Sequence, residues 1–252
     1  MKTMKKIRND QLDPEIIDWP VYMRRAIDLA GNAINTASNP KVGCVLVTDQ
    51  EIVGEGWHVA VGEDHAEIMA LKQAGDRAKS SIAFVSLEPC SHTGRTGPCS
   101  DALIKAGVSQ VVIASIDPNP EVAGSGVAKL LAAGIAVTQL TDFDPLSRAV
   151  TPGYFKRREQ GIPYVRCKLA MSLDGRTALA NGESKWISGQ QSRADVQRLR
   201  AASGAVITGI ETVLADDPSL NVRIEELNLH QEDLDRNQLS LSRQPLRVIL
   251  DS

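Results

Sequence analysis

The sequence predicts an α/β protein with two domains, and three observations lead to this prediction. The chain has 252 residues, more than the roughly 100–200 of an ordinary domain. Predicted strands alternate with predicted helices through the first half, which is typical of helices layered on a sheet. Turn-forming residues then cluster around a basic stretch. We therefore expect an N-terminal extension (1–19), a first domain (20–145), a linker (146–163) and a second domain (164–252).

The first domain is expected to begin with a helix over residues 21–30, where apolar residues recur at helical spacing after Pro20. A β-hairpin follows, with strands over 42–47 and 52–57 on either side of a polar turn. In the later part of this half, predicted strands alternate with predicted helices that end at glycines, as helix C-termini often do. The helices are predicted over 65–73, 101–106 and 127–133 and the strands over 82–87, 110–116 and 135–140.

The second domain gives a weaker pattern. It predicts a strand over 164–170, a helix over 191–201, a strand over 205–208 and a final buried strand over 248–250. The polar residues 228–244 are expected to form a flexible insertion.

Composition narrows the function classes. The chain carries 42% hydrophobic and 23% charged residues with a net charge of −3, which favours a globular protein and argues against binding to duplex nucleic acid. Its four cysteines are too few for a disulfide scaffold. The polar N-terminus lacks the apolar core of a signal peptide, and the longest apolar run, 111–116, cannot cross a membrane. We therefore expect a cytoplasmic protein with no membrane partner.

The strongest chemical signal is a set of metal-binding residues. His65-Ala66-Glu67 is followed by Pro89-Cys90 and then by Cys99. Zinc deaminases combine H-x-E with P-C-x-x-C, where one histidine and two cysteines bind zinc and the glutamate acts as acid and base. Here the usual two-residue spacer is lengthened to the polar segment 91–98. The pattern predicts a catalytic zinc site with His65, Cys90 and Cys99 as ligands.

Charge balance explains why Glu67 matters. Two thiolates and a neutral imidazole leave a bound zinc ion formally neutral, so its water is less acidic than on three imidazoles. A carboxylate that accepts the water proton restores a usable hydroxide, and the protonated acid can then donate to a ring nitrogen and to the departing amine. We assign this catalytic role to Glu67. The alternatives are unrelated buried cysteines or a structural zinc site, for which Cys44 could be the fourth ligand although it lies within an apolar strand.

The most specific segment of the sequence is Glu-Pro-Cys-Ser-His-x-Gly-x-Thr-x-Pro-Cys at 88–99. Other distinctive segments are 39–44, 54–58, 65–67, 117–120, 122–124, 168–177 and 212–218. Together they resemble one known family, the bifunctional deaminase/reductase of riboflavin biosynthesis. The resemblance implies a cytidine-deaminase-like α/β/α zinc domain followed by a dihydrofolate-reductase-like α/β domain. The family's reductase continues beyond Ser252, so we expect this second domain to be truncated. No dinucleotide-binding G-x-G-x-x-G run is present.

The resemblance also implies two consecutive reactions. The first domain would hydrolyse the 2-amino group of 2,5-diamino-6-(5-phosphoribosylamino)pyrimidin-4(3H)-one to give 5-amino-6-(5-phosphoribosylamino)uracil. The second would reduce the ribosyl group to ribityl with NADPH.

Residue roles follow from the same resemblance. The substrate of the first domain would contact Asn39, His58, His92, Arg95, Asp117 and Asn119. In the second domain, the substrate would contact Lys168, Ser184, Arg200, Leu220 and Arg223, and NADPH would contact Ala170, Trp186, Thr212, Asp216 and Ser252. Guanidinium groups such as Arg95, Arg200 and Arg223 suit a phosphate. Simpler structural roles stay open for several positions, such as a turn residue for Asn39 and core packing for Trp186 or Leu220.

Two alternative functions stay open. A zinc deaminase of another nucleobase, including adenosine in RNA, would need a basic surface interleaved with aromatics, whereas only 4% of this chain is aromatic. A non-catalytic zinc-binding module would not need Glu67. We also expect a homo-oligomer, since an unpaired strand edge in the second domain would favour self-association.

Overall fold

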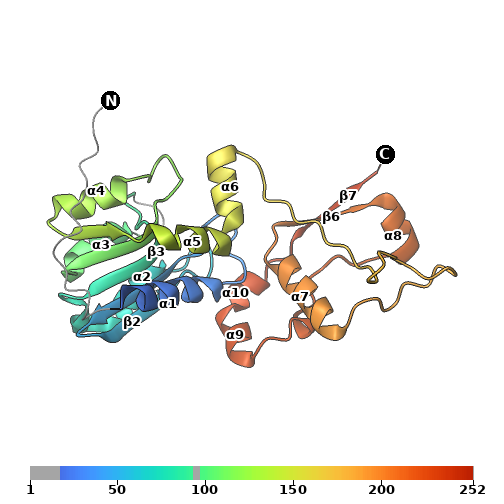
Figure 1. The fold of residues 1–252 in the computed structure, drawn as a ribbon, viewed down its shortest axis with the longest axis horizontal. Helices are drawn as coiled ribbons and strands as arrows, with labels where there is room; N and C mark the ends of the chain where they lie inside the picture. The colour runs from blue at the N-terminus through green and yellow to red at the C-terminus, as the bar shows by residue number, and fades with distance from the viewer. Residues whose placement is uncertain (1–17, 93–96, 252) are drawn as a thin grey trace.

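The first unit is built on a five-stranded mixed sheet. The computed structural model describes residues 18–92 and 97–251 (Figure 1). The strands run in the order β2-β1-β3-β4-β5; β1 is antiparallel to β2 and β3, whereas β3, β4 and β5 are mutually parallel. Their bounds are β1 Gly43–Thr48, β2 Glu51–Trp57, β3 Ile82–Leu87, β4 Gln110–Ser115 and β5 Ala136–Gln139.

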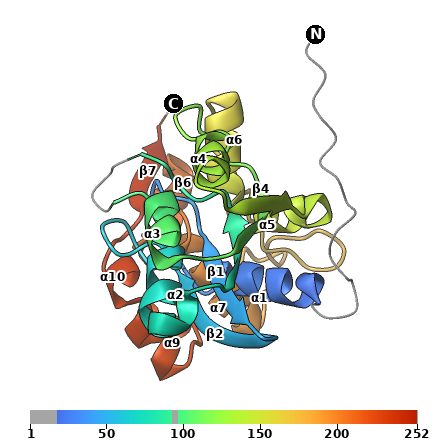
Figure 2. The same ribbon diagram turned by 90° about the vertical axis from the view of Figure 1, so that its left-hand side faces the viewer.

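Helices cover both faces of this sheet, as the alternation predicted. Side chains of a strand point alternately to opposite faces. In β1, Val45 and Val47 therefore pack with one set of helices, while Cys44 and Leu46 pack with the other. The first face is covered by α1 (Trp19–Gly31) and α5 (Asp144–Val150), and the second by α2 (Ala66–Ala74), α3 (Cys99–Ala106) and α4 (Ser125–Ala132) (Figure 2). Short 3-10 turns lie at Gly75–Ala78 and Thr141–Phe143.

Two glycines bring α2 into direct contact with β2. A Cβ atom on Gly56 would lie 2.3 Å from the carbonyl oxygen of Ala66, and one on Gly54 would lie 2.2 Å from that of Ala70. Real Cβ atoms do not approach this closely, so only glycine allows the helix backbone to rest on the strand. This contact sets the position of the N-terminal end of α2.

Residues 146–163 differ from the linker that we expected. They hold most of α5 and all of α6 (Pro152–Gln160), and each helix begins with a proline in its first turn. Leu146 and Val150 pack against the α1 side of the sheet, and Phe155 is buried. The turn-forming prolines and glycines of this stretch therefore lie at the ends of two helices that belong to the first unit.

The second unit has a parallel pair of strands and several helices. Its elements are α7 Gln190–Ala201, β6 Ala205–Gly209, α8 Ile210–Asp216, a 3-10 turn Ile224–Glu226, α9 Gln231–Arg236, α10 Gln238–Leu241 and β7 Leu246–Leu250. Strand β6 pairs in parallel with β7. A small core contains Ala201, Val222, Leu227 and Leu241. The predicted helix over 191–201 and the strands over 205–208 and 248–250 are confirmed.

Three expectations for the second unit were wrong. Residues 164–170 form no strand: they are mostly exposed, and within the described part of this unit only β6 and β7 pair. The polar residues 228–244 hold α9 and α10, because Leu234 and Leu241 pack into the small core. Strand β7 is largely exposed and not buried, since neither of its faces is covered along its whole length.

No helix among the described residues combines the length and apolar character that a membrane crossing requires.

Candidate metal centre and its cavity

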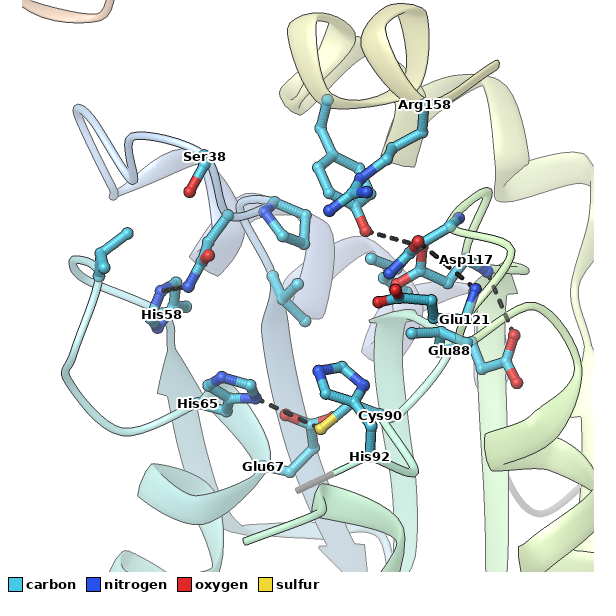
Figure 3. A pocket seen from close by; sticks show the side chains of 18 of the residues that line it. Ser38, His58, His65, Glu67, Glu88, Cys90, His92, Asp117, Glu121 and Arg158 are labelled. Carbon is cyan, nitrogen blue, oxygen red and sulfur yellow. Dashed lines mark hydrogen bonds between the residues drawn. The ribbon is translucent and has the colours of Figure 1, made fainter. Parts of the chain in front are cut away.

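The described site residues that were predicted for the first domain converge at one edge of the sheet. Strands β3 and β4 are parallel and end there, and loops that follow such strands are the usual binding edge of an α/β sheet. A cavity of about 400 Å³ opens at this edge. Figure 3 shows His65, Glu67 and Cys90 together at one end of it, with Arg158 reaching in from α6 at the other.

Three side chains form a compact set of metal ligands. His65 immediately precedes α2, Cys90 follows β3, and Cys99 is the first residue of α3. The His65 Nδ1 atom lies 3.2 Å from Cys99 Sγ and 3.7 Å from Cys90 Sγ. The backbone N–H of Cys99 donates to Cys90 Sγ at 3.3 Å.

These distances fit a tetrahedral zinc ion. Ligands at about 2.0–2.3 Å from zinc lie roughly 3.5 Å from one another in a tetrahedron. Hydrogen bonds from Cys99 and from His65 lower the pKa of Cys90 to about 4, so one thiolate is already favoured. The pKa of Cys99 is raised by its interaction with that thiolate and by burial. A dication would favour the thiolate form of both cysteines.

Cys44 does not join this set. Its side chain is fully buried among the apolar residues between β1 and α2, and burial raises the pKa of its thiol. Within the described residues, the group with metal-ligand geometry contains His65, Cys90 and Cys99. Structural zinc sites usually have four protein ligands, whereas a set of three leaves a position for water.

Glu67 lies next to the three ligands in the first turn of α2. Its side chain is 3% exposed and lines the cavity. Burial, followed by the nearby Cys90, raises the pKa of Glu67 to about 7. A carboxyl group with a pKa near neutrality can both accept and donate a proton, as a general acid–base catalyst must.

Asn39 and His58 form a hydrogen-bonded pair on a second wall. The Asn39 Nδ2 atom lies 3.0 Å from His58 Nε2, and His58 Nδ1 lies 3.1 Å from the carbonyl oxygen of Asp64. Burial lowers the pKa of His58, so the neutral ring is favoured. Its Nδ1–H then donates to Asp64, and its Nε2 accepts from the Asn39 amide. This arrangement leaves the Asn39 amide oxygen for a hydrogen-bond donor on a ligand.

The loop after β4 supplies Asp117 and Asn119, both buried and both lining the cavity. The Asp117 Oδ1 atom accepts from the backbone N–H of Asn119 and from the Tyr154 hydroxyl, each at 2.8 Å. Beneath this loop, the Glu88 carboxylate accepts from the backbone N–H groups of Asp117, Gly124 and Val127 at 3.2, 3.0 and 3.1 Å. The loop is therefore held by a network of hydrogen bonds.

Sequence reasoning missed three residues of this site. Tyr154 and Arg158 line the cavity from α6, in the stretch that was expected to be a linker. Their signal was the basic run 156–158, which sequence alone could not place beside the cavity. Glu88 belongs to the Glu-Pro-Cys motif, but its anchoring role becomes visible only with its backbone partners.

Of the two residues predicted in the loop between Cys90 and Cys99, the structure describes only one. His92 lines the cavity and is exposed. Arg95 lies outside the described residues, as does Ser252.

The described residues that were predicted for the second domain lie in several places in this structure. Ser184 and Trp186 line a smaller cavity of about 270 Å³, where Arg193 lies 4.4 Å from the Trp186 ring centroid. Arg200 and Arg223 are neighbours elsewhere: burial, followed by the charge of Arg223, lowers the pKa of Arg200. The remaining five line neither cavity: Lys168, Thr212 and Asp216 are exposed, and Ala170 and Leu220 are partly buried.

Two sequence families match this chain. The cytidine and deoxycytidylate deaminase zinc-binding region matches residues 19–115, and the RibD C-terminal domain matches residues 163–252. The first match contains all three metal ligands and Glu67. The region between the two matches contains Asp117, Asn119, Tyr154 and Arg158.

Whole-chain comparisons agree with these matches. The chain is 53% identical to the riboflavin biosynthesis protein RibD of Haemophilus influenzae and 52% identical to that of Escherichia coli. Each alignment covers 92% of this chain and 62% of the relative, so the chain spans a little under two thirds of their length.

Solved structures give the same picture. Acinetobacter baumannii RibD (form 1) superimposes with a TM-score of 0.82 at 51% identity. The diaminohydroxyphosphoribosylaminopyrimidine deaminase/5-amino-6-(5-phosphoribosylamino)uracil reductase of Thermotoga maritima superimposes with a TM-score of 0.79 at 36% identity. Each comparison covers 92% of this chain and 63% of the other. The chain is therefore similar to RibD, a riboflavin biosynthesis protein, over 92% of its own length.

Proposed function

We propose that this protein catalyses two consecutive steps of riboflavin biosynthesis. Its first unit hydrolyses the 2-amino group of 2,5-diamino-6-(5-phosphoribosylamino)pyrimidin-4(3H)-one and releases ammonia. Its second unit reduces the ribosyl group of the resulting 5-amino-6-(5-phosphoribosylamino)uracil to ribityl with NADPH. The similarity to RibD proteins, including the Thermotoga deaminase/reductase, supports this assignment.

One observation carries the deaminase assignment: a buried Glu67 lines the same cavity as the ligands His65 and Cys90, and Cys99 lies beside them. A zinc ion bound by this set would supply an activated water molecule. The Glu67 carboxylate takes one proton from the attacking water, whose oxygen forms the new C–O bond at C2 of the pyrimidine, and donates that proton to a ring nitrogen. It then takes the second proton from the new C2 hydroxyl and donates it to the departing amine, so that the C–N bond breaks, the C2 carbonyl forms and ammonia leaves.

The rest of the cavity suits a pyrimidine ribosylamino phosphate. The Asn39 amide oxygen is available for a ring N–H, since its Nδ2 is engaged by His58. Asp117 and Asn119 present an acceptor and an amide at the opposite wall, which suits ribose hydroxyls. Among the described lining residues, Arg158 alone carries a permanent positive charge, and it would pair with the phosphate. His92 and Arg95 of the metal-site loop would border the same substrate.

The reductase assignment rests on the match of residues 163–252 to the RibD C-terminal domain. The NADPH-side residues would be Ala170, Trp186, Thr212, Asp216 and Ser252, with Lys168, Ser184, Arg200, Leu220 and Arg223 on the substrate side. Both reactions would take place in the cytoplasm, where NADPH is available and the four free cysteines stay reduced. The protein would act as a homo-oligomer on a small molecule and not on a nucleic acid.

The test is an incubation of the zinc-loaded protein with the diaminopyrimidine ribosylamino phosphate and NADPH, with the products identified by mass. We expect a gain of about 1 Da on deamination, as NH is replaced by O, and a further gain of about 2 Da on reduction. A Glu67→Gln variant should keep its zinc and lose deamination by a factor of at least about 10³.

Other outcomes would redirect the assignment. Turnover of Glu67→Gln at the normal rate would exclude Glu67 as the proton carrier. No turnover by the zinc-loaded wild type would point to another base or to a non-catalytic zinc module. Deaminated product alone would restrict the assignment to the first unit.

A further inference from the structure

The segment that contains α9 and α10 docks onto the first unit through one buried side chain. Asn237 joins the two helices and is 2% exposed. Its Oδ1 accepts from the backbone N–H of Ile34, and its Nδ2 donates to the carbonyl oxygen of Asn32, both at 3.0 Å. The same Nδ2 donates to Asp233 within α9, also at 3.0 Å. The side-chain amide of Asn237 thus fixes the segment that follows α1 by hydrogen bonds to the backbone of Asn32 and Ile34.

Further contacts between the two units lie close to Asn237. The Asn35 Nδ2 atom donates to the carbonyl oxygen of Ala201 at 2.9 Å, and Ile34 packs against the small core of the second unit. Arg236 lies 5.7 Å from the ring centroid of Trp57 at the end of β2. The second unit therefore contacts two segments of the first, near residues 32–35 and at Trp57. Figure 1 shows α10 beside the end of α1.

Both contacted segments lead directly into the deaminase cavity. Beyond Asn35, the Thr36 hydroxyl donates to the Asn39 carbonyl at 2.8 Å, and the Asn39 N–H donates to the Thr36 carbonyl at 3.1 Å. Trp57 is followed at once by His58. The two segments then meet in the cavity, where the Asn39 amide bonds to His58.

We propose that Asn237 is a positioning residue for the deaminase site, which holds residues 32–39 so that Asn39 and His58 face the pyrimidine. The proposal rests on the deaminase function proposed above. Loops lose conformational freedom when they bind a ligand, and a contact that fixes them beforehand removes this cost from binding. In this protein the fixing contact comes from the unit assigned to the second reaction. The first active site therefore depends on the second unit for its substrate-binding geometry, while its metal ligands do not.

The experiment compares Asn237→Ala with Gln238→Ala in the full chain. Gln238 is the next residue and exposed, and its side chain makes no hydrogen bond within the described residues, which makes it a matched control. We expect Asn237→Ala to raise the KM for deamination about tenfold, with kcat and zinc content close to those of the wild type. Gln238→Ala should leave KM unchanged. A KM of Asn237→Ala within twofold of the wild type would overturn the proposal.

A double-mutant cycle separates positioning from general destabilisation. If Asn237 acts through Asn39, Asn237→Ala should have little further effect on KM once Asn39 is replaced by alanine. Effects that multiply fully would show that Asn237 does not act through Asn39, and would also overturn the proposal.

Hydrogen exchange gives a readout that does not need turnover. In Asn237→Ala the backbone amides of Ile34 and Asn39 should exchange at least about tenfold faster than in Gln238→Ala, while the core amides of β3 stay protected. If the wild type fails to deaminate the proposed substrate but the exchange of residues 32–39 responds as expected, the function is wrong and the positioning role stands. Unchanged exchange would overturn the positioning role whatever the substrate.

Discussion

The Tyr154 hydroxyl donates a 2.8 Å hydrogen bond to Oδ1 of Asp117 and so ties helix α6 to the loop after β4. Both residues lie between the two regions that match known sequence families. Burial raises the pKa of Tyr154, which keeps its hydroxyl protonated as a donor. The wall of the cavity opposite the metal ligands thus depends on a contact between two segments that neither family match includes.

Removal of this hydroxyl should weaken substrate binding. Burial raises the pKa of Asp117, whereas the hydrogen bonds from Asn119 and Tyr154 lower it. Tyr154→Phe should therefore raise the pKa of Asp117 further, and the acid limb of kcat/KM should move to higher pH. We expect the KM for deamination at neutral pH to rise about three- to tenfold. A full pH–rate profile measures both effects, with Tyr164→Phe, at an exposed position, as control. A profile identical to the wild type would refute the role of Tyr154.

Arg158 should make the deaminase site selective for a phosphorylated substrate over its dephosphorylated form. We expect Arg158→Ala to raise the KM for the phosphorylated substrate about tenfold or more, and to change little for the dephosphorylated compound. Its exposed neighbour Arg157 does not line the cavity, so Arg157→Ala is the matched control. Equal losses for both substrate forms would show that Arg158 does not recognise the phosphate.

Glu88 should be a structural anchor with an indirect effect on the site. Its carboxylate accepts three backbone N–H groups, and an amide in its place would turn an NH₂ group toward one of them. Glu88→Gln should lower the free energy of unfolding by about 1–3 kcal/mol. Denaturant titration measures this loss, and Glu121→Gln, at an exposed position on the same cavity, should be close to neutral. A Glu88→Gln protein as stable as the wild type would contradict the anchoring role.

Lys41 should make stability depend on pH. Burial, and secondly the charge of Arg166, lower the pKa of Lys41 from 10.5 to about 8. Between these values the unfolded chain holds a proton that the folded protein has lost, so the contribution of Lys41 to stability increases as pH rises from about 8 to 10.5. Lys41→Met should remove this dependence and stabilise the protein below pH 8 by up to about 3 kcal/mol.

The measurement for Lys41 is denaturant unfolding of both proteins at several pH values. Other groups titrate in this range, but they are common to both proteins, so the difference between them isolates Lys41. A difference that stays constant from pH 7 to 10.5 would exclude a lowered pKa for Lys41.

The accuracy of the sequence prediction follows the packing of each segment. Elements such as 82–87 and 110–115 were predicted closely because each is an apolar strand bounded by turns, and both are buried in the sheet. The segment 164–170 has apolar residues at strand spacing, but among the described residues it pairs with no strand, so the spacing was misleading there. In 228–244, a polar majority concealed Leu234 and Leu241, whose burial depends on partners distant in the chain.

The residues of the site also differ in whether they could be predicted from the sequence. His65, Glu67, Cys90 and Cys99 could be found from sequence because metal chemistry requires particular residue types at restricted spacings. Tyr154, Arg158 and Asn237 are common polar residues, and their roles arise only when the fold brings them to Asp117, the cavity and Asn32. Composition and spacing carry no signal for such contacts.

The contact of Gly54 and Gly56 with α2 has a consequence for how this protein can change over time. Main chain touches main chain there, so the separation of helix and strand is fixed by the van der Waals radii of backbone atoms. Apolar residues elsewhere in the core can be exchanged without altering that separation. His65 and Glu67, at the start of α2, should therefore keep their place when core residues elsewhere are exchanged, whereas any side chain at Gly54 or Gly56 would push the helix away from the strand.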